Sequence, residues 1–235
     1  MDESDQGDSY LLAGKLPCPK CTSSDAYHVY SNGWGHCFAC DSNIPEDVEQ
    51  TNREVAPMQQ GLIPKGEHVY MNKRKLDAST CVLWDYTKSD YKGTAVQVAN
   101  YKDKKGQTIA QKIRFPNKDF LFLGDTKNIP LYGQWLWPSG GKMVTIVEGE
   151  LDALSASQAQ GNKWPTVSLS HGCASAVKQV RSNIEWLLTF DRVNIMFDMD
   201  DVGQEAARKV AELFPPRKAH IARLPQKDAS DMLQR

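Results

Sequence analysis

Four cysteines form the most specific chemical pattern in the chain. Cys18 and Cys21 form one pair, CPKC, and Cys37 and Cys40 form a second, CFAC, after fifteen intervening residues. Each pair can offer two thiolates from one tight turn, and the segment between them is about long enough for a β-hairpin that brings the turns together. The spacing therefore predicts a zinc ribbon that holds one structural Zn²⁺.

Two disulfides are the alternative interpretation of this pattern. Residues 1–9 carry no apolar run of the kind found in a secretory leader, and thiols in reducing cytosol favour a metal over a disulfide. We therefore expect reduced cysteines and a cytoplasmic protein. Cys81 and Cys173 have no paired spacing, so we expect them to be ordinary core or loop residues.

Acidic side chains follow the strand-like segments at 143–147, 192–197 and 219–224. They are Glu148, Asp198, Asp200 and Asp228. Because the carboxyl ends of parallel strands meet at one edge of a sheet, these carboxylates can meet in one place. Crowded carboxylates repel one another unless cations neutralise them, and hard oxygen ligands suit Mg²⁺. The pattern predicts a magnesium site.

Neighbouring residues have competing interpretations. Asp201, with Gln204 three residues later, is expected to be the N-cap of the next helix. Glu150 and Asp152 either complement a helix dipole or support the metal ligands from behind. The loop 170–175 precedes a helix and is either a phosphate-binding loop or a simple strand-to-helix turn.

Basic residues gather in the middle of the chain. Residues 51–142 carry a net charge of +7, against −7 for residues 1–50 and −1 for the remainder. In the strand predicted at 107–115, Lys112 and Arg114 project from the face opposite Ile113, and Lys118 follows shortly after. This exposed face is expected to contact phosphate, and a solvated surface is the alternative.

The elements that must position these residues fall into four regions. An apolar content of 40% and a charged content of 24% are ordinary for a globular protein, and no apolar run is long enough to span a membrane. We expect an α/β (α+β overall) fold: a small β zinc ribbon at 1–40, a flexible linker at 41–65, a mixed basic subdomain at 66–142, and alternating strands and helices at 143–235. The last pattern predicts a mainly parallel sheet flanked by helices.

At this point the motifs support a family resemblance. VEGELDAL and MFDMDDVG, about forty residues apart, resemble the TOPRIM module that DnaG-type primases, topoisomerases, OLD-type nucleases and RecR proteins share. The order of ribbon, linker, QKIRF, TOPRIM and a closing KDAS resembles the primase half of the bifunctional primase-helicases of podovirus-type bacteriophages.

This resemblance implies a DNA primase, a nucleotidyltransferase that synthesises short RNA primers on a single-stranded DNA template for replication. It implies one or two catalytic Mg²⁺ ions, with Mn²⁺ as a substitute, at the four acids above. It also implies that Lys112, Arg114 and Lys118 contact the nucleoside triphosphate or the primer-template. Trp34 and His36 are then candidates for stacking on DNA bases. The implied partners are ribonucleoside triphosphates, a replicative helicase, fused or separate, and a DNA polymerase.

Two departures from the family pattern limit what is transferred. The segment 32–36 differs from the family form, which has a histidine near Trp34, so no template triplet is carried over; burial of Trp34 in the ribbon is the alternative to stacking. No GxxxxGK[ST] loop occurs, so no helicase is expected in this chain. A TOPRIM nuclease or topoisomerase fragment and a non-catalytic RecR-like DNA-binding protein remain the alternative functions.

Overall fold

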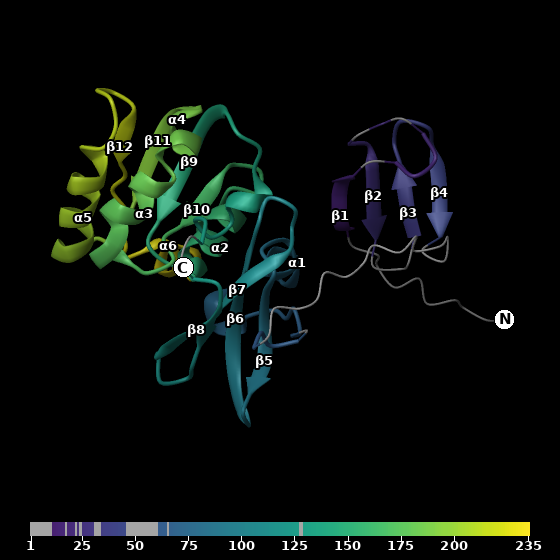
Figure 1. Ribbon diagram of the computed structural model, residues 1–235, viewed down its shortest axis with the longest axis horizontal. Coiled ribbons are helices and arrows are strands. Elements are labelled where there is room, and N and C mark those ends of the chain that lie inside the picture. The colour runs from purple at the N-terminus through teal and green to yellow at the C-terminus, as the bar shows by residue number, and fades with distance from the viewer. Residues whose placement is uncertain are drawn as a thin grey trace. The chain divides into compact units, whose positions relative to one another are not determined.

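The computed structural model describes residues 11–16, 18–21, 23, 25–30, 34–45, 61–64, 66–126 and 129–235. The chain divides into two compact units, Met1–Pro57 and Met58–Arg235 (Figure 1). No helix in the described ranges is long and apolar enough to cross a membrane. Most of the predicted linker, residues 46–60 and 65, lies outside the described residues.

The first unit is a four-stranded antiparallel ribbon. Its strands are β1 (Leu11–Leu16), β2 (Tyr27–Tyr30), β3 (Trp34–Cys37) and β4 (Ser42–Pro45), in that order across the sheet. The predicted hairpin between the cysteine pairs is present as β2 and β3, with Tyr27 opposite Cys37. Gly35 lies under the ring of Tyr27, and a Cβ there would collide with that ring, which explains the glycine.

The boundary predicted at residue 40 is wrong. Residues 42–45, which the sequence assigns to the linker, pair with β3 from Cys37↔Ser42 to Trp34↔Pro45. Ile44 is buried and packs with Cys18 and Cys37, so β4 supplies part of the small ribbon core. Polarity and proline content concealed this strand, because an edge strand tolerates both.

The second unit contains an antiparallel sheet that the sequence predicts in part. Its strands are β5 (Tyr86–Tyr91), β6 (Thr94–Lys102), β7 (Thr108–Arg114) and β8 (Phe120–Gly124). The hairpin of β6 and β7 is confirmed, with a turn closed by Gly106. Two short helical segments precede the sheet, η1 (Asn72–Arg74) and α1 (Ala78–Leu83).

Both faces of this sheet are covered, contrary to expectation. Ile113 packs with Val96 and Val98 on one face, where Ile63 also lies. Ala110, predicted to lie on the exposed polar face with Lys112 and Arg114, is fully buried in a cluster with Tyr101. Strand alternation correctly assigned the faces, but the polar face lies against the rest of the unit.

The predicted parallel sheet is confirmed in the order β10-β9-β11-β12. Its strands are β9 (Gly141–Val147), β10 (Thr166–Ser168), β11 (Phe190–Met196) and β12 (Ala219–Ile221). Its helices are α2 (Glu150–Ala159), α3 (Ala176–Ser182), α4 (Ile184–Leu188), α5 (Asp201–Ala211) and α6 (Ala229–Leu233), with short turns η2 (Gln134–Leu136) and η3 (Cys173–Ser175).

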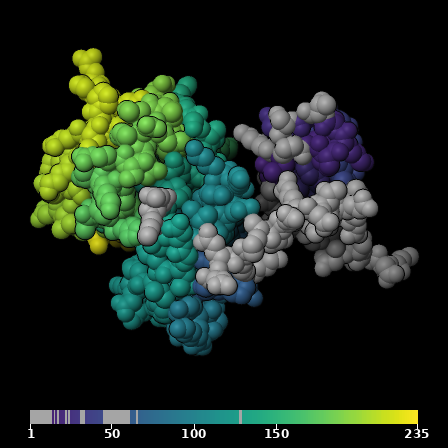
Figure 2. Space-filling view, viewed as in Figure 1, coloured from purple at the N-terminus to yellow at the C-terminus, as the bar shows by residue number. Residues whose placement is uncertain are grey.

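One core cluster joins the two sheets of the second unit. Val147 at the end of β9 and Leu154 of α2 pack in the same cluster as Tyr101 of β6 and Trp84 after α1. Tyr132 reinforces this junction, since its backbone bridges to Ser168 and its hydroxyl donates to the carbonyl oxygen of Trp84 at 2.6 Å. Figure 2 shows the teal and green parts in direct contact. The carboxyl ends of the parallel strands are thereby brought to the polar face of β7.

Candidate active site and cysteine cluster

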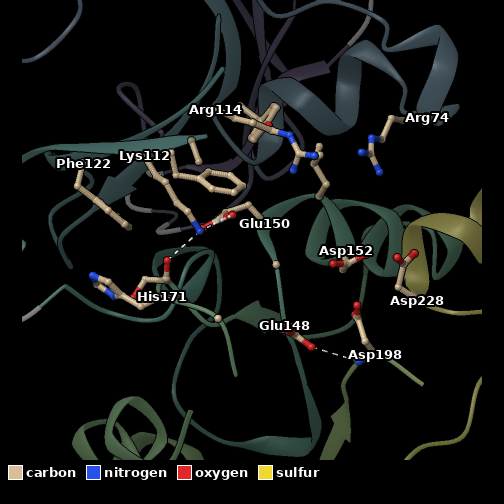
Figure 3. A pocket seen from close by; sticks show the side chains of 17 residues that line it. Arg74, Lys112, Arg114, Phe122, Glu148, Glu150, Asp152, His171, Asp198 and Asp228 are labelled. Atoms are coloured by element: carbon tan, nitrogen blue, oxygen red, sulfur yellow. Dashed lines mark hydrogen bonds and ion pairs between the residues drawn. The ribbon is translucent and has the colours of Figure 1, made fainter. Parts of the chain in front are cut away.

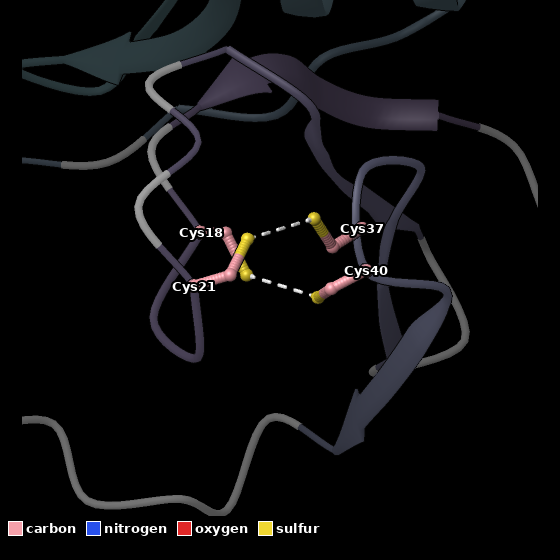
Figure 4. A group of neighbouring side chains, drawn as sticks. All are labelled: Cys18, Cys21, Cys37 and Cys40. Carbon is pink, nitrogen blue, oxygen red and sulfur yellow. Dashed lines mark hydrogen bonds between the residues drawn. The ribbon is translucent and has the colours of Figure 1, made fainter.

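The four cysteines of the ribbon converge as predicted. Their Sγ atoms all lie within 4.8 Å of one another, and the pairs Cys18–Cys40 and Cys21–Cys37 are each separated by 3.8 Å (Figure 4). A tetrahedral Zn²⁺ with bonds of about 2.3 Å requires sulfur–sulfur separations of about 3.8 Å. The donor set and spacing therefore fit Zn²⁺.

A cavity of about 530 Å³ in the second unit is lined by several acidic side chains. Glu148 follows β9, Asp198 follows β11 and Asp228 stands at the start of α6. A carboxylate oxygen of Glu148 accepts the backbone N–H of Asp198 at 3.4 Å, which joins the ends of two neighbouring strands (Figure 3). The structure thus brings together three of the four acids that the sequence proposes.

Asp152 is a fourth acid of this cavity. It lies in the first turn of α2 and accepts the backbone N–H of Ser230 at 3.1 Å. Burial, together with the charges of Asp228 and Asp198, raises its pKa to about 7. Of the two interpretations left open for Asp152, its position among the acids favours support of a metal site over a role limited to the helix dipole.

The pKa of Asp198 is also raised, to about 6, by burial and by the charges of Glu148 and Asp228. Lys227, whose Nζ lies 3.7 Å from the Asp198 carboxylate, offsets only part of this repulsion. A pocket of oxygen donors with excess negative charge fits a divalent cation such as Mg²⁺. These carboxylates are more widely spaced than the thiolates, which form the one tight ligand cluster among the described residues.

The roles predicted for Asp200 and Asp201 are exchanged in part. Asp200 is the N-cap of α5 and accepts the backbone N–H of Gly203 at 2.9 Å, whereas Asp201 lies in the first helical turn. The prediction that Asp201 is the N-cap is therefore wrong by one residue. Asp200 is exposed and does not line the cavity, although its charge contributes to the raised pKa of Asp198.

Basic side chains form the opposite wall of the cavity. Arg114 and Lys112 come from β7, and Arg74 comes from η1 (Figure 3). Arg74 donates to the hydroxyl of Ser230 at 2.8 Å, across 156 residues of sequence. No local motif marked Arg74, because its place in the cavity depends on this long-range contact.

The sequence predicts that Lys112 lies on an exposed surface, and this prediction is wrong. Lys112 is held in a largely buried network. Its Nζ donates to both carboxylate oxygens of Glu150, at 2.9 and 3.1 Å, and to the carbonyl oxygen of Ser170 at 2.8 Å. The hydroxyl of Tyr101 donates to the same carboxylate at 2.5 Å. Glu150 is therefore the counter-ion of Lys112, and the buried charge pair is satisfied from every side.

Three predicted residues remain, and of these Lys118 belongs to the second unit but does not line the cavity. Lys118 is exposed, in a turn after β7, with a positive φ of 71°. On the ribbon, the side chain of Trp34 is 48% exposed. The His36 ring lies 2.8 Å from the side-chain oxygen of Asn43 and packs edge-on against Phe38. Phe38 is more exposed than Trp34 and was not singled out by the sequence.

Comparisons with known proteins agree with this architecture. Residues 66–124 match a family described as the bacteriophage T7 DNA helicase/primase N-terminal α+β fold, and residues 145–233 match a Toprim-like family. The DNA helicase/primase of Enterobacteria phage T3 is 34% identical over 236 residues, which cover 95% of this chain and 42% of that protein.

Two solved structures are also similar. The crystal structure of the primase fragment of the bacteriophage T7 primase-helicase protein is 32% identical, with a TM-score of 0.69 and coverage of 94% of each chain. A bacteriophage T7 lagging-strand DNA polymerase structure contains primase domains bound to an RNA/DNA hybrid and dTTP. The matching chain is 36% identical, with a TM-score of 0.67 and coverage of 71% of this chain and 84% of that one. The present chain spans less than half the length of its curated phage T3 relative.

Proposed function

Because this chain belongs to the family of TOPRIM DNA primases of the phage primase-helicase type, we propose that it synthesises short RNA primers on single-stranded DNA. The reaction joins ribonucleoside triphosphates with release of pyrophosphate. The proposed place of action is the cytoplasm of the infected host cell.

One observation carries the proposal: acidic side chains and positively charged side chains face each other across a single cavity. Glu148, Asp152, Asp198 and Asp228 line one side, while Arg74 and Arg114 line the other. Nucleotidyl transfer requires this division, because a triphosphate needs cations around it and the reacting phosphorus needs metal ions beside it. Four of the five acids that line the cavity have no contact with Lys112, and a purely DNA-binding surface would gain nothing from them, since they repel the phosphate backbone.

Each metal has a proposed set of ligands. Cys18, Cys21, Cys37 and Cys40 would hold one structural Zn²⁺. Glu148, Asp152, Asp198 and Asp228 would hold one or two Mg²⁺, or Mn²⁺ in its place, with Asp200 nearby. Mg²⁺ bound there would neutralise charge on the phosphates and lower the pKa of the attacking 3′-hydroxyl.

The chain's own side chains would bind and orient the substrates. Arg114 and Arg74 would hold the triphosphate, because a guanidinium binds phosphate with two parallel hydrogen bonds. Lys112 would lie beside them with its charge compensated by Glu150, so the two arginines would supply most of the positive charge. Lys118 would contact the primer-template backbone outside the cavity. A replicative helicase and a DNA polymerase are the proposed protein partners.

The ribbon is proposed to select the template site. Trp34 and His36 would contact unpaired bases, Trp34 by stacking with its exposed ring. We propose that each region has its own role. The ribbon recognises the template, residues 66–142 bind nucleotide and template, and residues 143–235 carry the metal-dependent chemistry.

A direct test measures RNA synthesis. The chain is incubated with radiolabelled ribonucleoside triphosphates, Mg²⁺ and single-stranded DNA of varied sequence, and short RNA products are resolved on a gel. We expect template-dependent products from the wild type and none from Asp198→Asn. Asp201→Asn is the matched control, because Asp201 is an exposed acid outside the cavity and should retain full synthesis.

The same assay separates the alternatives. Degradation of the template with no RNA product would indicate a TOPRIM nuclease. DNA binding without either reaction, unchanged in Asp198→Asn, would indicate a RecR-like protein, and both outcomes would refute the proposed function.

A further inference from the structure

An exposed aromatic ring lies at the border of the cavity that the acidic and basic side chains line. Phe120, at the start of β8, lines this cavity and is 50% exposed. Phe122 also lines it, but its ring already stacks on His171, with centroids 4.7 Å apart and planes at 16°. Tyr86, a third aromatic residue of the cavity, is buried. Among the phenylalanine and tyrosine side chains that line the cavity, Phe120 therefore has the most open surface.

Two cations lie over this ring. The Nζ of Lys112 lies 4.8 Å from the ring centroid and the Cζ of Arg114 lies 5.4 Å from it. Both residues belong to β7, where Arg114 is the cross-strand partner of Phe120. Because β8 is the last strand of its sheet, no strand of that sheet borders Phe120 on the other side. The ring thus contacts two cations and remains 50% exposed.

This combination matches a ligand that is both flat and anionic. Core packing does not account for Phe120, since the residue is 50% exposed. A nucleobase stacks on an aromatic face whatever its sequence identity, while the attached phosphates require cations such as Arg114. The carboxylates that would hold divalent ions lie in the same cavity, within reach of the same ligand.

We propose that Phe120 is the stacking platform for the base of the nucleoside triphosphate bound in this cavity, with the phosphates directed toward Arg114 and the acids. The proposal rests on the proposed function and adds to it a base-binding subsite. Because stacking does not read the base edge, the platform accepts all four bases and leaves sequence selection to pairing with the template.

The test compares a ligand that has a base with one that lacks it. Binding of ATP and of inorganic triphosphate to the full chain is measured by titration calorimetry at fixed salt, with Mg²⁺ and without template. In the wild type ATP should bind more tightly than inorganic triphosphate. Loss of one base–aromatic contact should weaken ATP binding about 5- to 150-fold, so Phe120→Ala should remove most of this preference.

Two further variants complete the design. Phe120→Tyr keeps the ring and should keep the preference for ATP. Tyr70→Ala removes a ring of similar exposure, 51%, that lies outside the cavity, and should bind both ligands as the wild type does.

An unchanged preference for ATP in Phe120→Ala would overturn the subsite, as would an equal loss of affinity for both ligands. These results are separable from failure of the proposed function. RNA synthesis by the wild type together with unchanged base preference in Phe120→Ala refutes the subsite alone. Base-dependent binding that needs Phe120, without any RNA synthesis, refutes the primase function alone.

Discussion

Replacement of Asp152 by asparagine should stabilise the metal-free chain while abolishing RNA synthesis. Asp152 is buried among Asp198 and Asp228, and its pKa is raised from the usual 3.8 to about 7. Ionisation of this carboxyl therefore costs about 4 kcal/mol more in the folded chain than in the unfolded chain. Asparagine keeps the side-chain oxygen that accepts from Ser230 but carries no charge.

The sign of the pH dependence follows from these values. Well below pH 3.8 the carboxyl is protonated in both folded and unfolded chains, and the two proteins should be equally stable. As the pH rises toward 7 the unfolded chain ionises first, so the wild type loses stability that the variant retains. At pH 8 the variant should be more stable than the wild type by about 2 to 4 kcal/mol. The lower figure applies if Asp198 and Asp228 adjust their own protonation in the wild type and so reduce the repulsion that the variant removes.

The assay is thermal unfolding of the second unit from pH 4 to pH 8, without added Mg²⁺ and then with it. A gain of this size corresponds to a rise in Tm of roughly 4 to 16 °C for a domain of this length. Mg²⁺ should stabilise the wild type more than the variant, and Asp201→Asn should match the wild type throughout. A variant that is less stable at pH 8, or a difference that does not change with pH, would refute the electrostatic reasoning.

Three other perturbations have distinct expected outcomes. Cys37→Ser should reduce zinc content by about one ion per chain, measured by atomic absorption, and should abolish initiation on single-stranded DNA while extension of an annealed RNA persists; sequence-specific initiation without zinc would contradict this. Lys118→Ala should raise the apparent KM for substrates at low salt, and the defect should shrink as salt rises, because screening already weakens the phosphate contact. Tyr101→Phe removes one hydrogen bond to Glu150 and should destabilise the chain by about 1 to 3 kcal/mol in urea unfolding; unchanged stability would show that the Lys112–Glu150 pair does not need the hydroxyl.

The ribbon shows how far a local pattern can determine a site. Cys18, Cys21, Cys37 and Cys40 were identified by spacing alone, and the structure brings their sulfur atoms together. A CxxC turn fixes two ligands within four residues, so little depends on the rest of the fold. The strand at residues 42–45 was missed because only its pairing with β3 distinguishes it from a polar linker.

The acids divide by the same criterion. Parallel strands end at one edge of a sheet, so strand signals were sufficient to place Glu148 and Asp198 together. Asp200 and Asp201 could not be told apart, because helix boundaries read from sequence shift by one residue and each aspartate is a good N-cap.

The sequence by itself determined the cysteine cluster, the parallel sheet and the edge at which its acids meet, because each depends on local spacing or on alternation along one element. Only the tertiary structure decided which charges neutralise one another. Glu150 pairs with Lys112, 38 residues away in the sequence, and Asp152 lies near Asp198 and Asp228. Arg74 is held at the cavity by its hydrogen bond to Ser230. Such partners are chosen by the packing of one sheet against the other, and no periodicity within a single strand or helix records that choice.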